Sequence, residues 1–215
     1  MGQLEKQLRC KSAYGDDVAV ASLLMQGADV NATDSSGWAA LHWACHNGST
    51  AVVSVLLDNG ADIRIKSYTG ETALHKACYR GRSALVGVLL QRLGLREINS
   101  KDYAGRTPLH NACFYDQNEA AIALIRSGAD VTISKDTGET PLEMATEAAR
   151  LTLTSLHAEV NKVWFARRAF LIVLVGCGFV GRKGDECGDD SKLTSIERMR
   201  SDVFRNLHIS IFSYL

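Results

Sequence analysis

Three histidines recur along the chain at nearly equal distances, and they are the first residues whose spacing could carry chemistry. His42, His75 and His110 are separated by 33 and 35 residues, and each follows a leucine. Histidine is a common metal ligand and a frequent general base. A zinc site would require the rings to converge, because the ligands of one zinc ion lie about 2.0–2.3 Å from it. Whether they converge depends on the elements that carry them.

Three cysteines recur in the same register as the histidines. Cys45, Cys78 and Cys113 each stand three residues after a histidine and directly after an alanine. Disulfide formation or redox sensing is one interpretation of this series. Packing between helices is the favoured one, because a free cysteine behaves as a small apolar side chain.

A glycine pattern near the C-terminus could bind a dinucleotide. Gly176, Gly178 and Gly181 spell G-x-G-x-x-G directly after the strand-like apolar run 170–175. That fingerprint requires a helix that begins in the glycine turn, so that its N-terminus faces pyrophosphate. Residues 182–191 have the composition of a loop instead, and too few residues remain for a doubly wound sheet. We therefore predict a Gly-rich loop over 176–192 and no bound cofactor.

No other motif supplies a metal site or a catalytic site. Cys177 and Cys187 flank the Gly-rich loop, but no histidine stands near them to complete four zinc ligands. The chain has no H-E-x-x-H helix, no G-x-x-x-x-G-K-[ST] phosphate loop and no Ser-His-Asp order. The sequence predicts a protein that is not an enzyme and holds no metal.

The charge balance argues against a nucleic-acid partner. Lys and Arg number 24, and Asp and Glu also number 24, so the chain has no net charge. DNA-binding domains usually carry a basic stripe, and none is visible along the sequence. We expect another protein as the partner, and no nucleic acid.

The ends of the chain predict a soluble, intracellular protein. The first residues are polar, unlike a secretory signal, and Lys6 stands where a myristoylation pattern requires Ser or Thr. The apolar run over 170–180 is too short to span a membrane, which takes roughly 20 residues. We expect the six cysteines to be reduced in a cytoplasmic or nuclear monomer. Stable membrane insertion is not expected, and any membrane association would be weak and peripheral.

The histidines and cysteines belong to a segment that occurs four times. Its first glycines are separated by 33, 35 and 33 residues, and one leucine and one alanine keep the same spacing. A second pattern, Gly-Ala-Asp, begins at Gly27, Gly60 and Gly128 in the same register. Such self-similarity is typical of repeat proteins. The four copies are Gly37–Cys45, Gly70–Cys78, Gly105–Cys113 and Gly138–Thr146.

These residues resemble the signature of the ankyrin repeat family, G-x-T-P-L-H-x-A with a period of about 33. Only the third copy, Gly105–Ala112, carries the whole signature. Alanine replaces proline at Ala40 and Ala73, and Glu143 replaces the histidine of the last copy. The resemblance covers roughly residues 15–150. It implies an all-α solenoid of paired antiparallel helices with turn-like or β-hairpin-like fingers.

The resemblance also implies a structural role for the histidines, which in this family tie one repeat's turn to the next through hydrogen bonds. One ring per repeat would place successive rings about 10 Å apart, the usual spacing of packed helices. Such a ladder cannot converge on one zinc ion. Two extra residues around Gly94 predict a bulge in the loop after the second repeat's outer helix. The predicted organisation is a capping ankyrin-like repeat at 1–33, ankyrin repeats over 34–150 (about 34–66, 67–101, 102–134 and 135–160), and a helical C-terminal extension at 161–215.

The candidate partner-binding residues are those that vary between repeats in the turn before each inner helix and on its exposed face. Seven Phe, Trp or Tyr residues lie between residues 31 and 150, and six of them occupy these positions; the seventh is Trp43. Aromatic residues with nearby Arg are typical of interaction hot spots, although some could pack against neighbouring turns. The candidates are Ser35, Ser36, Trp38, His46, Asn47, Tyr68, Thr69, Glu71, Tyr79, Arg80, Tyr103, Arg106, Phe114, Tyr115, Asp136, Thr137 and Glu139.

The C-terminal extension leaves three hypotheses open. Steps of three and four residues between apolar side chains over 196–211 indicate an amphipathic helix. This helix could fold back in a helical hairpin that caps the repeats, or it could dock into a partner's groove. The third hypothesis is reversible membrane association through the apolar segment 163–180.

The sequence as a whole predicts a non-catalytic protein-interaction module, a scaffold or an adaptor. The last residues, 207–215, faintly resemble the final helix of SOCS or F-box adaptors, without the proline expected near it. This resemblance implies the first alternative, a substrate-recruiting adaptor of a ubiquitin ligase. The second alternative is a regulatory subunit of an enzyme.

Overall fold

The structure, a computed structural model, describes residues 2–176, and side chains through residue 163. Every regular element within this range is a helix. The chain divides into two units, residues 1–157 and residues 158–215. The first unit contains all of the repeats. The described part of the second unit is a length of helical backbone that ends at Gly176.

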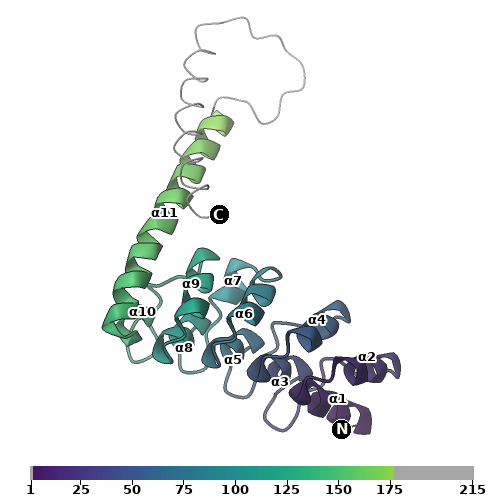
Figure 1. Cartoon of the computed structure of the whole chain (residues 1–215). Coiled ribbons are helices and arrows are strands. Elements are labelled where there is room, and N and C mark those ends of the chain that lie inside the picture. The colour runs from purple at the N-terminus through teal and green to yellow at the C-terminus, as the bar shows by residue number, and fades with distance from the viewer. Residues whose placement is uncertain (1, 177–215) are drawn as a thin grey trace, which may run out of the picture. The chain divides into compact units, whose positions relative to one another are not determined.

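The first unit is built from successive pairs of antiparallel helices. In Figure 1 the inner helices follow one another along one side of the stack and the outer helices along the other. Neighbouring inner helices pack against each other, as a solenoid requires. The inner helices are α1 (Gln3–Tyr14), α3 (Ala40–Asn47), α5 (Ala73–Tyr79), α8 (Pro108–Phe114) and α10 (Pro141–Met144). The outer helices are α2 (Asp17–Met25), α4 (Thr50–Asp58), α6 (Ser83–Leu90), α9 (Asn118–Arg126) and the start of α11 (Glu147–Gly176).

The repeated leucines and alanines form the core, which confirms the predicted all-α ankyrin solenoid. Leu41, Leu74 and Leu109 are each at most 2% exposed. The alanines three residues later, at 44, 77 and 112, are fully buried. Alanine is small enough to let adjacent inner helices approach closely, so neighbouring pairs cover one another's apolar faces. Leu142 is only half-buried.

The turns before the inner helices form fingers linked by backbone hydrogen bonds rather than by strands. Within one finger, the Ser67 N–H donates to the Glu71 carbonyl at 2.9 Å. Between fingers, the Tyr68 N–H donates to the Ser36 carbonyl at 3.0 Å, and the Tyr103 N–H donates to the Thr69 carbonyl at 3.1 Å. The fingers therefore form a continuous ladder along one edge of the stack.

Two elements depart from the regular repeat. The extra residues around Gly94 form a single helical turn, α7 (Leu95–Ile98), which buries Ile98. Leu95 of the same turn lies over Gly128 of the next repeat. The inner helix of the last repeat, α10, is also only one turn long, because the backbone becomes extended at Ala145.

The apolar run 170–175 is helical. Its composition is strand-like, but its backbone lies inside helix α11, within the helical extension predicted over 161–215. A dinucleotide fingerprint must follow a strand, and the glycine pattern here follows a helix instead. The remainder of the Gly-rich loop and the predicted amphipathic helix over 196–211 lie outside the described residues.

Neither a membrane span nor a metal cluster is found within the described range. None of its helices combines the length and the apolar character needed to cross a bilayer. None of its His, Cys, Asp and Glu side chains gather in a group of three or more that could hold a metal ion.

Candidate functional site

The three recurring histidines join consecutive repeats. The His75 Nδ1 accepts the Thr72 backbone N–H at 3.1 Å, so the ring proton is on Nε2. That Nε2–H donates to the Arg106 carbonyl of the next finger at 3.1 Å. His42 and His110 repeat this geometry, with Glu71 and Glu139 as the carbonyl acceptors. Each ring is committed to two backbone groups of its own repeat and the next, as the family resemblance implies.

Burial keeps these three histidines, here called the ladder histidines, neutral. It lowers the pKa of His42 and of His75 from the ordinary 6.5 to about 4. It also lowers the pKa of His110. The rings are therefore fixed donors and acceptors near neutral pH, not proton-transfer groups.

The last repeat replaces the histidine with a glutamate that completes a capping box. The Glu143 Oε2 accepts the Thr140 N–H at 2.7 Å and the Thr140 hydroxyl at 2.8 Å. The carboxylate therefore reproduces the half of the histidine's role that lies within its own repeat. It has no N–H with which to donate to a following finger.

The recurring cysteines are packing residues. Cys45 and Cys78 are fully buried, Cys113 is 3% exposed, and all three are free thiols. Burial raises the pKa of Cys45 and Cys78, and it raises the pKa of Cys113 to about 12. Since the thiolate is the reactive form, these side chains are not suited to redox chemistry.

The finger tyrosines have a structural role besides their exposure. Tyr68 and Tyr103 are 70% and 71% exposed. However, a Cβ at Gly37 would lie 2.8 Å from the Tyr68 ring, and a Cβ at Gly70 would lie 2.8 Å from the Tyr103 ring. Each tyrosine thus covers the glycine of the preceding finger, which is the packing alternative considered for these aromatic residues.

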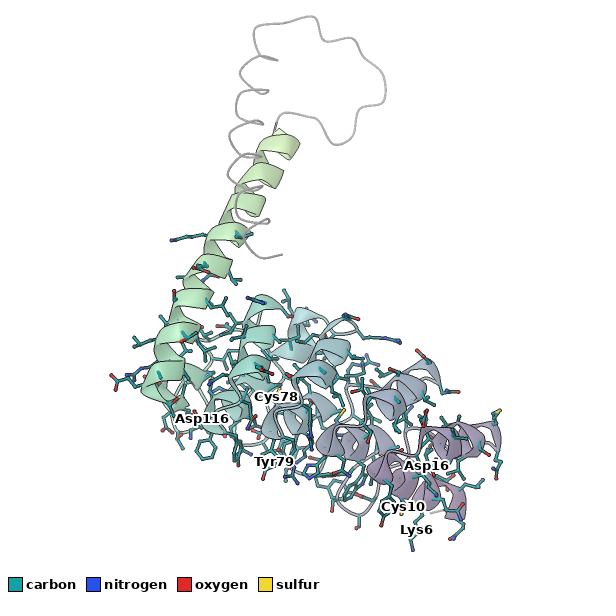
Figure 2. The ribbon with its side chains drawn as sticks, viewed as in Figure 1. Lys6, Cys10, Asp16, Cys78, Tyr79 and Asp116 are labelled. Atoms are coloured by element: carbon teal, nitrogen blue, oxygen red, sulfur yellow. The ribbon has the colours of Figure 1, made fainter. Side chains whose placement is uncertain are left out.

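A continuous series of rings runs along the inner helices of three repeats. We call Trp38, His46, Tyr79, Tyr115 and Phe114 the ring row. The successive centroid distances are 5.5 Å, 6.1 Å, 4.4 Å and 4.8 Å. Figure 2 shows Tyr79 at the lower edge of the stack, the side formed by the inner helices.

The ring row is open to solvent toward its C-terminal end. Tyr79 is 36% exposed, Tyr115 38% and Phe114 57%, whereas Trp38 and His46 are half-buried. The rings of Tyr79 and Tyr115 meet edge to face. Preassembled aromatic surfaces of this kind offer contact area at little cost in side-chain entropy.

Basic side chains accompany the ring row. Lys76 Nζ lies 4.5 Å from the centroid of the Trp38 ring and forms an ion pair with Glu71. The Arg80 guanidinium lies 5.6 Å from the Tyr79 ring and donates to His46 Nε2 at 2.9 Å. Predicted candidates of the first two full repeats are therefore in contact: His46 of one repeat touches Tyr79 and Arg80 of the next.

Several of the remaining polar candidates form hydrogen bonds or ion pairs within the repeat stack. Arg106 Nε donates to the buried carboxylate of Asp102 at 2.8 Å. Asn47 Nδ2 donates to the Ala13 carbonyl of the first helix pair at 2.6 Å. Glu139 pairs with Lys135 at 2.7 Å. Ser35, Ser36, Thr69, Asp136 and Thr137 are exposed in the fingers.

Sequence reasoning missed the variable position between the histidine and the alanine of L-H-x-A. Trp43 and Lys76 occupy it in the first two full repeats. The Trp43 ring lies tilted against the Trp38 ring, with centroids 4.7 Å apart, and its indole N–H donates to the Asp34 carboxylate at 3.1 Å. The residue type at this position differs between otherwise similar repeats, and that variation could have marked it as a further binding candidate.

Comparison with protein families agrees with the geometry. Two family models match the chain, "Ankyrin repeats (3 copies)" over residues 9–102 and "Ankyrin repeats (many copies)" over residues 89–145. No curated protein matches it at a significant level. Ankyrin repeats are in general protein–protein interaction modules, and proteins built from them are typically not enzymes. With the ladder of histidines, the linked fingers and both family matches in agreement, the chain belongs to the ankyrin repeat family.

Proposed function

We propose that this protein is a non-catalytic scaffold or adaptor that binds a partner protein through the ring row and the adjoining fingers. The observation that supports this most is the row itself. Five rings in contact span three repeats, and the three toward the C-terminal end are substantially exposed. Soluble proteins rarely leave contiguous apolar surface exposed unless it binds something.

The fingers give this surface a polar border. Exposed hydroxyls and carboxylates at Ser36, Thr69 and Asp136 lie next to backbone already fixed by the finger ladder. An aromatic centre with a polar rim is the usual composition of a protein interface. A pre-ordered rim adds little entropic cost when a partner binds.

The test is affinity capture with two matched variants of the intact chain. The first variant is Tyr79→Ala/Phe114→Ala/Tyr115→Ala, which removes the exposed part of the ring row. The control is Tyr14→Ala/Val18→Ala/Met25→Ala, which removes three even more exposed apolar side chains from the first helix pair. Proteins retained by the wild type and the control but lost by the first variant would support the proposal. Equal retention by all three would refute it.

The proposal also covers the location and the oligomeric state of the protein. The free thiols at Cys10, Cys45, Cys78 and Cys113 support an intracellular location, cytoplasmic or nuclear. We further propose that the protein is a monomer, which sedimentation would test.

The ubiquitin-ligase alternative depends on residues 207–215, which lie outside the described part of the chain. No observation favours it or a regulatory enzyme subunit over a scaffold.

A further inference from the structure

The contact between His46 and Arg80 is unusual, because it joins two side chains that are both basic. Arg80 Nε and Nη2 lie 3.2 Å and 2.9 Å from His46 Nε2. A guanidinium has only donors, so this imidazole nitrogen must be the acceptor. The ring is therefore neutral, and its single proton is on Nδ1.

That proton has no partner. His46 Nδ1 is buried, and no acceptor lies within hydrogen-bond distance of it in the part of the chain that the structure describes. A buried N–H without an acceptor carries a free-energy cost and is uncommon in folded proteins. The hydrogen bonds from Arg80 hold the ring in this tautomer in spite of that cost.

The surroundings of this ring are positive. The Arg82 side chain lies over Gly48, two residues from His46. A Cβ built at Gly48 would be only 2.7 Å from the Arg82 Nε. Within residues 2–163, neither Arg80 nor Arg82 has a carboxylate within 4.0 Å. Lys76 also faces the ring, although its charge is balanced by Glu71. Burial, Arg80, Lys76 and Arg82 together lower the pKa of His46.

We propose that His46, Arg80 and Arg82, here called the cationic cluster, bind a carboxylate of an acidic segment in the partner protein. The inference rests on the proposed function, since the cluster lies within the ring row between Trp38 and Tyr79. A carboxylate beside Arg80 would accept from the guanidinium N–H groups that His46 does not use. Apolar side chains next to it in the segment would lie on Tyr79 and Tyr115.

The same surface argues for a peptide carboxylate rather than a run of phosphates. Acidic side chains follow the cluster along the stack, at Asp116 after Tyr115 and at Asp136 in the last finger. A nucleic-acid strand that followed the row would meet these carboxylates, and the chain has no net positive charge to offset them. A short segment with one or two acidic residues avoids that repulsion.

Glu71, Lys76, Arg80 and Arg82 are the charged groups that face the His46 ring. The ring stays neutral while Arg80 donates to its Nε2. A carboxylate that binds the remaining guanidinium N–H groups therefore needs no proton uptake by His46.

The probe is a phage-displayed library of short random peptides, selected on the immobilised full-length chain. We expect selected peptides to share an Asp or a Glu. Arg80→Gln should weaken their binding at least tenfold, and Arg96→Gln, an exposed arginine on α7, should leave it unchanged. Replacing the shared acidic residue by its amide should weaken binding to the wild type but not to Arg80→Gln. A single-stranded oligonucleotide is titrated in parallel.

The outcomes distinguish failure of this inference alone from failure of the proposed function. Peptides that depend on Tyr79 and Tyr115 but lack an acidic residue, or tolerate Arg80→Gln, would overturn the cationic cluster and leave the proposed function intact. Peptides that tolerate both changes, or a selection that yields none, would count against both. Oligonucleotide binding that is lost in Arg80→Gln would assign the cluster to phosphate and overturn the inference.

Discussion

The ladder histidines are buried as neutral rings, and this ties the stability of the fold to pH. His75 donates to Arg106 and accepts from Thr72, so it has no room for a second proton without losing a hydrogen bond. In the unfolded chain the same ring would titrate near its ordinary pKa of 6.5, whereas in the folded chain its pKa is about 4. Between these values the unfolded state binds more protons.

The free energy of unfolding should therefore fall as the pH is lowered from about 6.5 to about 4. Two and a half pKa units correspond to a loss of about 3 kcal/mol from His75 alone. Urea unfolding at neutral pH and at about pH 4.5 measures the difference. His75→Gln should lower stability at neutral pH but reduce the pH dependence, since glutamine does not titrate. An unchanged pH dependence in the variant would show that folding does not lower the pKa of His75.

Asp116 occupies a position where the preceding repeats use glycine. Its φ is 53°, whereas Gly48 and Gly81 in the equivalent turns have φ of 86° and 64°. The left-handed conformation is unfavourable for residues with a Cβ, although aspartate tolerates it better than most. Figure 2 shows Asp116 on the same edge of the stack as Tyr79. An unfavourable backbone conformation next to exposed rings is an arrangement often found at binding sites.

Asp116→Gly should raise the free energy of unfolding by about 0.5–1 kcal/mol, because glycine adopts this backbone without strain. Asp116→Ala should lower it, since alanine lacks the polar side chain that makes the left-handed region tolerable. Thermal unfolding of the two variants checks both signs. If glycine destabilised the protein, the carboxylate would have a structural role that outweighs the backbone strain.

At the scale of elements, each finger depends on the one that follows it. Gly70 has a φ of 81°, and the backbone N of Tyr103 lies 2.7 Å from where its Cβ would be. Gly138, in the last finger, has a φ of 91°, but within the described residues nothing except its own chain neighbours lies within 4 Å of that place. The two glycines therefore share the conformational requirement, and only Gly70 has the close contact.

Gly138→Ala should cost about 1–2 kcal/mol, the penalty of a left-handed alanine. Gly70→Ala should cost more, by about 1–3 kcal/mol, because the finger ladder must also shift to admit the methyl group. Chemical denaturation of both variants isolates the contact between fingers. Equal costs would mean that adjacent fingers are not in close contact in solution.

Much of the repeat architecture could be predicted because its residues have single, local roles. Leucine, alanine and glycine recur wherever the same packing or turn is needed, so their period indicates the fold. The role of the histidines followed from the family resemblance rather than from their spacing. The ring row was predicted in part, since its aromatic residues were identified as exposed candidates.

The features that were not predictable depend on contacts between different repeats. Arg80 and His46 are 34 residues apart, and nothing in either repeat alone indicates that they meet. The packing of Tyr68 on Gly37 likewise depends on the next finger's position. The single-turn length of α10 was also missed, because its sequence departs from the signature only at Glu143 up to Ala145 and gives no sign of an early end.

At the scale of the whole repeat unit, stability should decrease toward the last repeat. There Glu143 replaces the linking histidine, Leu142 is only half-buried, and α10 is one turn long. Since a solenoid is held by contacts between neighbours, the end with fewer contacts opens first. Backbone amides in α10 should exchange with deuterium faster than those in α5. Equal protection would contradict this graded stability.

The central claim is that a partner protein binds along the inner helices, on the ring row. Oxidative footprinting of the intact protein, free and bound to a captured partner, tests this directly, because aromatic side chains react readily when exposed. We expect Tyr79, Phe114 and Tyr115 to be protected in the complex, while Tyr14 and Met25, exposed on the first helix pair, react at their free rates. Unchanged oxidation of the three rings, with protection on the outer helices instead, would contradict the account.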